Sequence, residues 1–128
     1  MILSCQKEKV EPVLANLPNI LREVSGTEVL INSSFIWMIN DSGNSSNLFG
    51  VDKQGTIQKV LKINAKNHDW EDITSDPSGN LYIGDFGNNS QKRTDLCIWK
   101  IEGEKAPQAI RFQYEDQTEF PGNPPNFD

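Results

Sequence analysis

The chain has 128 residues, with 18 acidic and 12 basic side chains and a formal net charge of −6 at pH 7. This length favours a single domain, and the acidic balance argues against a nucleic-acid partner because no basic stretch is available to neutralise phosphates. No apolar run approaches the ~20 residues that span a bilayer, and β-branched and aromatic runs recur along the chain, which disfavours disorder. The composition predicts a soluble, acidic, all-β protein.

Residues 1–18 are predicted to form an N-terminal tail. The run MILSC at residues 1–5 resembles the end of a bacterial lipoprotein signal, with an apolar stretch, a small residue and the cysteine that is acylated. Only three residues precede Ser4, whereas a full signal has about 7–15 apolar residues, so the run is either the remnant of a longer signal or an ordinary tail. In the first case Cys5 carries lipid, residues 6–18 are a tether, and the domain is extracytoplasmic, with no membrane contact other than that lipid.

The rest of the chain contains an internal repeat. The aligned segments are 21–25 with 69–73, 37–44 with 81–88, and 48–52 with 98–102, at offsets of 48, 44 and 50. Asp41 coincides with Asp85 in this alignment, and the glycine two residues further on also coincides. A unit of roughly 45–50 residues is the size of one four-stranded propeller blade.

Each repeat contains four predicted short strands. In chain order they lie near 23–31, 35–40, 47–52 and 56–63, and then near 71–76, 80–85, 96–102 and 108–114. These runs are rich in β-branched and aromatic residues, and no long segment has helical periodicity. Turns at 52–55 and 76–79 place Asp at the first position and Gly at the fourth, which is typical of β-turns.

Residues 19–128 are therefore predicted to be a partial β-propeller of four-stranded antiparallel sheets, with about two blades. Blade one covers about 19–66, blade two about 67–114, and residues 115–128 lead into a third. Because propellers close with about four to eight blades, the chain is expected to be an N-terminal fragment of a larger ring. Its unpaired blade faces are expected to cause self-association.

The combined motifs resemble a known group of proteins. The segments that carry the resemblance are 40–44, 69–74, 81–89, 93–96 and 98–101. Together they are similar to uncharacterised bacterial β-propeller proteins of Bacteroidetes type, distantly similar to NHL-repeat and gluconolactonase-like propellers. The resemblance covers about residues 19–128 and implies a secreted or lipid-anchored protein. It implies a fold more strongly than an activity, because the family has no settled activity.

The resemblance also implies metal ligands. In gluconolactonase-like propellers an acid at the start of an innermost strand faces the central channel and binds a divalent cation. Carried over to this chain, that role falls to Glu23 and Glu71, with Asp72 beside the second. Carboxylate oxygens suit Ca²⁺ or Mg²⁺. The alternative is that these acids are solvated strand ends or bind backbone amides.

Three further residues are candidate ligand contacts. Asp41 and Asp85 follow apolar strands in Asp-x-Gly-Asn loops, where an Asp commonly accepts hydrogen bonds from nearby backbone amides. The functional interpretation is that they line a loop face and contact a ligand, with Trp70 as the aromatic wall of a pocket. For Trp70 the alternative is packing between blades. The Lys92-Arg93 pair is interpreted as a solvated part of a loop, and no catalytic residue is predicted.

The predicted function is an extracytoplasmic recognition or scaffold module that binds a small molecule, carbohydrate or peptide on the loop face. The alternative is a metal-dependent hydrolase of lactonase or esterase type. In that case Glu23 and Glu71 contribute to a cation centre that polarises a carbonyl group and activates water.

Overall fold

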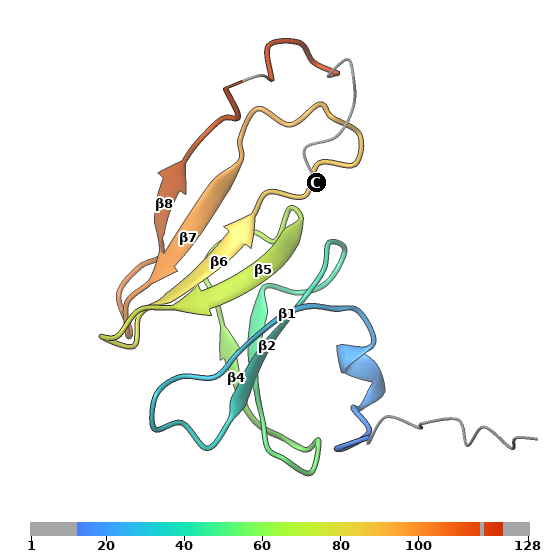
Figure 1. Ribbon diagram of the computed structural model, residues 1–128, viewed down its shortest axis with the longest axis vertical. Helices are drawn as coiled ribbons and strands as arrows, with labels where there is room; N and C mark the ends of the chain where they lie inside the picture. The colour runs from blue at the N-terminus through green and yellow to red at the C-terminus, as the bar shows by residue number, and fades with distance from the viewer. Residues whose placement is uncertain (1–12, 116, 122–128) are drawn as a thin grey trace, which may run out of the picture.

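Two four-stranded antiparallel sheets make up the fold (Figure 1). The computed structural model describes residues 13–115 and 117–121. Sheet 1 contains, in order, β1 (Val24–Glu28), β2 (Ile36–Asn40), β3 (Asn47–Val51) and β4 (Ile57–Lys62). Sheet 2 contains, in order, β5 (Trp70–Ser75), β6 (Leu81–Asp85), β7 (Cys97–Ile101) and β8 (Gln108–Arg111). The prediction of an all-β chain with two antiparallel four-stranded units is confirmed, and the sheets do not close into a ring.

Helical structure within the described ranges is limited to the short 3-10 helix η1 (Asn19–Leu21). None of the described residues belongs to a helix long and apolar enough to cross a membrane. Cys5 lies outside the described residues, as do the rest of 1–12, residue 116 and 122–128. The lipid anchor therefore stays a prediction.

Two turns follow the predicted chemistry. The carboxylate of Asp52 accepts hydrogen bonds from the backbone N–H groups two and four residues further on, at 2.9 Å each. The carboxylate of Asp76 does the same at 2.9 and 3.0 Å. Gly55 and Gly79 have φ angles of +82° and +81°, a conformation that strains other residues. These turns join β3 to β4 and β5 to β6 without further connecting structure.

The strands β1 and β5 each contain a β-bulge near their start, and the bulges show which residues of the two sheets are equivalent. The extra residue is Ser25 in β1 and Glu71 in β5. The flanking pairs are Val24 with Asn40 and Gly26 with Ile39 in sheet 1, and Trp70 with Asp85 and Asp72 with Gly84 in sheet 2. Ser25 therefore corresponds to Glu71.

This register shifts the predicted alignment by one or two residues. The carbonyl of Glu23 accepts a hydrogen bond from the N–H of Asp41 at 2.9 Å, and that of Asp69 accepts one from Gly87 at 3.1 Å. Glu23 thus corresponds to Asp69, two residues before its predicted partner Glu71, and Asp41 corresponds to Gly87. The shift arises because the Asp-x-Gly-Asn motif, which occurs in both repeats, starts at different places relative to the strand. In sheet 1 it begins one residue after the end of β2, whereas in sheet 2 it begins at the last residue of β6.

Each sheet has a front face and a back face, which we define by these equivalences. The front face carries Trp37, Ile39 and Leu48 in sheet 1 and their equivalents Tyr82, Gly84 and Ile98 in sheet 2. The back face carries Met38, Phe49 and Val51 in sheet 1 and their equivalents Ile83, Trp99 and Ile101 in sheet 2.

The main core forms where the front of sheet 1 packs on the back of sheet 2. The buried side chains of this core are Trp37, Ile39, Leu48, Ile63, Ala65, Trp70, Ile73, Leu81, Ile83 and Ile101. The back of sheet 1 is covered separately by Leu21 of η1. The sheets therefore stack front to back, as successive repeats do. In a sandwich with two-fold symmetry, by contrast, the same face of each sheet would meet.

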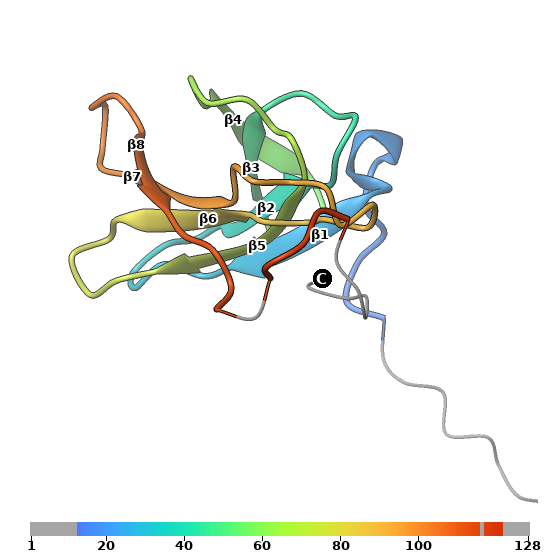
Figure 2. The ribbon, with the colours of Figure 1, turned by 90° about the horizontal axis from the view of Figure 1, so that it is seen from above.

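The two sheets come closest at their first strands. A side chain at Gly26 of β1 would approach the backbone nitrogen of Ile73 in β5 to 2.9 Å, so this contact requires glycine. The outer strands β4 and β8 lie far apart, and the sheets diverge from β1 and β5 toward them (Figure 1). Figure 2 shows the same stack from above, with sheet 2 lying over sheet 1. The stack is a wedge whose narrow edge is formed by β1 and β5.

Candidate functional site

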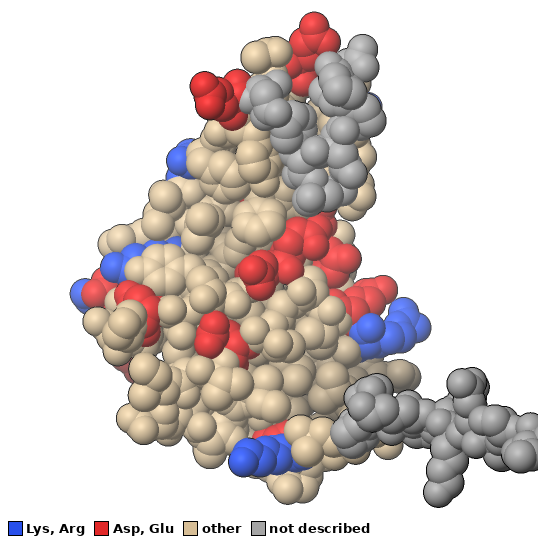
Figure 3. Space-filling view, in the orientation of Figure 1, with Lys and Arg blue, Asp and Glu red and all other residues tan. Residues whose placement is uncertain are grey.

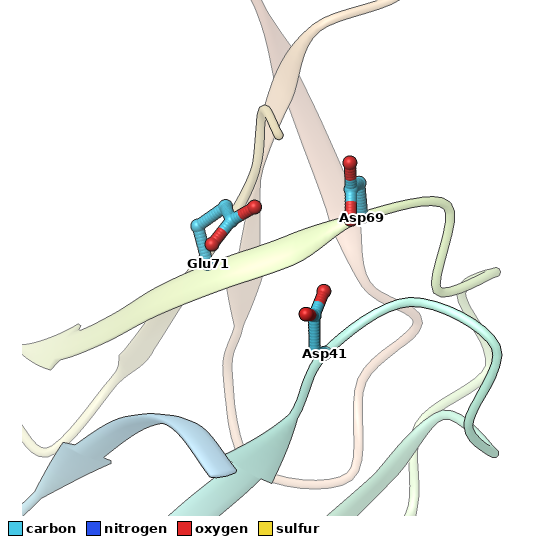
Figure 4. Close-up of side chains that lie close together, drawn as sticks. All are labelled: Asp41, Asp69 and Glu71. Atoms are coloured by element: carbon cyan, nitrogen blue, oxygen red, sulfur yellow. The ribbon is translucent and has the colours of Figure 1, made fainter. Parts of the chain in front are cut away.

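Three carboxylates from the two sheets meet at one end of the narrow edge. Asp41 directly follows β2, Asp69 directly precedes β5, and Glu71 is the bulge residue of β5. Their side chains project into a common space, and the candidate ligand oxygens all lie within 4.8 Å of one another (Figure 4). All three residues are half-buried. We refer to Asp41, Asp69 and Glu71 as the carboxylate cluster.

The environment of the cluster favours the neutral form of one member. Burial raises the pKa of Asp69 above its usual range, and the neighbouring Asp41 raises it further. A hydrogen bond from Ser42 and the charge of Arg93 act in the opposite direction, but the net shift is upward. Negative charge is therefore costly here, and either a proton or a cation would relieve the repulsion.

A glycine makes room for the cluster. A side chain at Gly87 would overlap the carboxylate oxygens of both Glu71 and Asp69. The backbone N–H of Gly87 also donates to the carbonyl of Asp69, which keeps the two segments together. Since the equivalent of Gly87 in sheet 1 is Asp41, the same backbone position supplies a carboxylate in one sheet and space in the other.

Asn67 connects the two halves of the site. Its side-chain NH₂ donates to the carbonyls of Asn40 and Asp41, at 3.0 and 2.9 Å, and its side-chain oxygen accepts from the N–H of Trp70 at 3.1 Å. The end of β2 is thereby tied to the start of β5. This link, made by a buried amide, sets the spacing between Asp41 and the carboxylates on either side of Trp70.

Asp85 supports the site from behind and does not open onto it. Its side chain is 2% exposed and forms an ion pair with Arg93, at 2.9 Å between Oδ1 and Nη1. Its carboxylate also accepts from the indole of Trp99 at 3.2 Å and from the N–H of Asp69 at 3.1 Å. Asp85 is therefore a positioning residue for Asp69. It acts through the hydrogen bond to the backbone N–H of Asp69 and not through the carboxylate of that residue.

Arg93 holds the loop between β6 and β7, contrary to its interpretation as part of a solvated pair. Besides Asp85, it bonds the carboxylate of Asp95 at 3.0 Å and the carbonyl of Gly87 at 2.9 Å. Asp95 in turn lies 3.0 Å from Nδ1 of His68. Through Asp95, Arg93 therefore also helps to hold the imidazole of His68 beside the site.

The other predicted site residues lie outside the carboxylate cluster. Glu23 accepts a hydrogen bond from the side chain of Asn44 at 2.9 Å and is otherwise exposed. The carboxylate of Asp72 accepts from the N–H of Ile73 at 2.8 Å and lies on the front face of sheet 2. Trp70 is fully buried in the core between the sheets, as the packing alternative expects.

The predicted metal ligands and the observed cluster thus share only Glu71. Asp41, predicted as a ligand contact, belongs to the cluster, and Asp69 was not singled out at all. Its signal in the sequence was the acid pair on either side of Trp70, which becomes informative only when the bulge at Glu71 is known.

The surface around the site is acidic. Figure 3 shows Asp and Glu side chains grouped near the middle of one side of the molecule, where Figure 1 places the first strands of the two sheets. A surface of this sign attracts cations and repels anionic ligands.

Comparison of the chain with protein-family models, curated proteins and solved structures found no match. The resemblance to bacterial propellers therefore stays a prediction.

Proposed function

We propose that the two sheets are blades of a β-propeller and that the carboxylate cluster binds a divalent cation, Ca²⁺ or Mg²⁺, as part of an extracytoplasmic recognition module. The cation anchors a small molecule, carbohydrate or peptide at the narrow edge of the wedge. The front-to-back stacking and the convergence of β1 with β5 support the propeller arrangement. The extracytoplasmic location rests on the sequence around Cys5.

The observation that carries the proposal is the approach of Asp41, Asp69 and Glu71 within 4.8 Å. Like charges at this separation repel, and burial at Asp69 reduces the screening by water. Ca²⁺ takes six to eight oxygen ligands, of which three carboxylates supply a part. The remaining positions are then open to backbone oxygens, water and the hydroxyl or carbonyl groups of a ligand.

Recognition fits the site better than hydrolysis. His68, the one histidine of the chain, is bonded to Asp95 and not to a Ser or Cys of the described residues, and the hydroxyl of Ser42 is bonded to Asp69, a carboxylate of the cluster itself. The hydrolase alternative requires the cation itself to polarise a carbonyl group and activate water. The hydrolase alternative therefore depends on the same three carboxylates. Only a measurement of substrate turnover distinguishes it from recognition.

Calorimetric titration of the full chain with Ca²⁺ and with Mg²⁺ tests the proposal. We expect one cation per chain, and at least about tenfold weaker binding in Asp41→Asn and Glu71→Gln, because each removes a charged ligand. Glu104→Gln, an exposed acid in the turn between β7 and β8, is the matched control and should bind as the wild type does.

Two results would count against this function. Absence of binding and of any thermal stabilisation at millimolar Ca²⁺ or Mg²⁺ would remove the cation. Cation-dependent hydrolysis of an aryl ester or a lactone, lost in Glu71→Gln, would replace recognition by the hydrolase alternative.

A further inference from the structure

The outer strand of sheet 1 has a free side. β4 pairs with β3 on one side, and no strand among the described residues pairs with it on the other. Five of its six residues are exposed, and none of the six is a proline. The backbone N–H and C=O groups on that side are therefore open to an added strand, which is one of the common ways in which a sheet binds an extended peptide. We refer to this free side as the β4 edge.

A hollow lies beside the β4 edge, at the wide end of the wedge. It has a volume of about 510 Å³ and is lined by both sheets. Leu61 and Ile63 line it from sheet 1, and Ile101, Ala106 and Pro107 line it from sheet 2. An apolar side chain that entered this edge hollow would contact both sheets and leave water, which favours its binding.

The register of sheet 1 shows where the side chains of an added strand would point. Leu61 lies opposite Leu48 of β3, which is buried in the core between the sheets, so Leu61 faces sheet 2. Val60 lies opposite Phe49 and belongs to the back face. Leu61 is 37% exposed and Val60 is 51% exposed. Because neighbours across a sheet share a face, an added strand would cover both residues and place the partner of Leu61 in the edge hollow.

The β4 edge is positively charged, although the chain as a whole carries a net charge of −6. Residues 53–66 contain none of the 18 acidic residues and four of the 12 basic ones, Lys53, Lys59, Lys62 and Lys66. All four are exposed, and none of them forms an ion pair with a described residue. Lys59 and Lys62 lie on β4 itself, on either side of the apolar pair Val60 and Leu61. Unpaired positive charge at this edge favours an acidic partner.

Lysines on a free edge also protect it, because they hinder pairing with the edges of other sheets. Protection of this kind needs charge alone. The β4 edge has in addition an exposed apolar pair between its two lysines and a hollow beside that pair, and such pockets give specificity when a strand is added. The two roles are compatible, since lysines that repel a basic strand attract an acidic one.

We propose that the β4 edge binds an extended peptide with the pattern acid–apolar–apolar–acid, which adds to sheet 1 as a fifth strand. The two acidic residues lie opposite Lys59 and Lys62, and the two apolar residues cover the pair between them. The residue opposite Leu61 fills the edge hollow. The pattern reads the same in both directions, so either strand orientation satisfies it. This site lies at the wide end of the wedge, away from the carboxylate cluster, and needs no cation.

A second copy of this chain does not offer such a strand. No run of four residues in the sequence has an acid at each end and two apolar residues between them. The outer strands β4 and β8 contain no acidic residue, so pairing the β4 edge with either strand of another copy brings no negative charge to Lys59 and Lys62. The partner is therefore a different chain.

Fluorescence anisotropy with a labelled peptide tests the proposal on the full chain, in chelator so that the cation site plays no part. The peptide has a valine and a phenylalanine between two glutamates, with a threonine at each end. We expect saturable binding at micromolar concentrations, and at least about tenfold weaker binding in Lys62→Glu, because like charges then face each other. Lys53→Glu, at an exposed lysine in the turn before β4, is the matched control and should bind within about twofold of the wild type.

Two methylated peptides test the addition of a strand. In each, every second backbone N–H is replaced by N-methyl, starting at the first residue in one peptide and at the second residue in the other. Since only alternate N–H groups of an added strand point toward β4, one peptide should lose binding and the other should keep it. A peptide with lysines in place of the glutamates should bind Lys62→Glu better than it binds the wild type.

Four results would overturn the inference. Absence of binding at millimolar peptide would remove the site. Equal weakening in Lys62→Glu and Lys53→Glu would show a diffuse attraction of charge, and equal binding of the two methylated peptides would exclude the addition of a strand. Binding of a single-stranded oligonucleotide as tightly as the peptide, weakened in Lys62→Glu, would make a nucleic acid the occupant.

Discussion

The carboxylate of Asp85 and the guanidinium of Arg93 form a buried ion pair, with 2.9 Å between Oδ1 and Nη1 and side chains that are 2% and 15% exposed. The same carboxylate accepts the backbone N–H of Asp69. The position of one member of the carboxylate cluster is therefore set by an ion pair that lies behind it. This relationship separates the residues that would bind a ligand from those that hold them in place.

Arg93→Met is expected to destabilise the fold by about 3–5 kcal/mol, because it leaves the buried charge of Asp85 without its partner. Urea denaturation followed by tryptophan fluorescence measures the change. Lys92→Met, at the exposed neighbouring position, is the control and should stay within about 0.5 kcal/mol of wild type. Equal stability of the two variants would show that the ion pair is dispensable.

Gly87→Ala is expected to disrupt the carboxylate cluster, because the added methyl group would overlap the carboxylates of Glu71 and Asp69. Both the free energy of unfolding and cation affinity should fall. In Glu71→Ala the same glycine substitution should cost less, since one of the two overlapping groups is gone. The measurement is a double-mutant cycle on unfolding free energy, and additive costs would contradict the steric explanation.

Local patterns were sufficient to predict the strands and turns. The strands are visible as β-branched and aromatic runs. The turns at 52–55 and 76–79 form where they were predicted, because the Asp side-chain hydrogen bonds that hold them lie within five residues. Trp70 could be given two roles from the sequence, and only its burial between the sheets favours packing.

The carboxylate cluster could not be assembled in the same way. Asp41 and Asp85 stand in similar motifs, yet one lies in the cluster and the other is buried behind it. The difference arises because Asp41 lies one residue beyond the end of β2, whereas Asp85 is itself the last residue of β6. Where a strand ends depends on its pairing with the neighbouring strand and not on the local motif. Asp69 approaches Asp41 only because the two sheets stack front to back, a long-range relationship that no local pattern contains.

The stability of the chain should depend on pH through Asp69. Burial and the charge of Asp41 raise its pKa in the folded chain above the ordinary value of 3.8, so the folded state binds this proton more tightly than the unfolded state. The resulting stabilisation is fully present below the unfolded pKa and is lost as the pH rises through the folded pKa.

Asp69→Asn removes this effect and is expected to raise the melting temperature at pH 7 but not at pH 3. Differential scanning calorimetry of both proteins at the two pH values, in chelator, measures the difference. A variant that melts below the wild type at pH 7 would show that the Asp69 carboxylate is stabilising in its charged form. In buffer without chelator, added Ca²⁺ should narrow the gap at pH 7, because it stabilises the wild type more than the variant that lacks one charged ligand.

Trp70→Ala is expected to destabilise the fold by about 3–5 kcal/mol, because the indole is fully buried in the core between the sheets. Chemical denaturation measures the loss. Trp70→Phe keeps most of the buried area and should cost clearly less, while leaving cation affinity unchanged because the indole is not among the cluster ligands. If Trp70→Phe were as stable as the wild type and yet failed to bind a carbohydrate or peptide that the wild type binds, Trp70 would instead be the ligand contact that the sequence suggested.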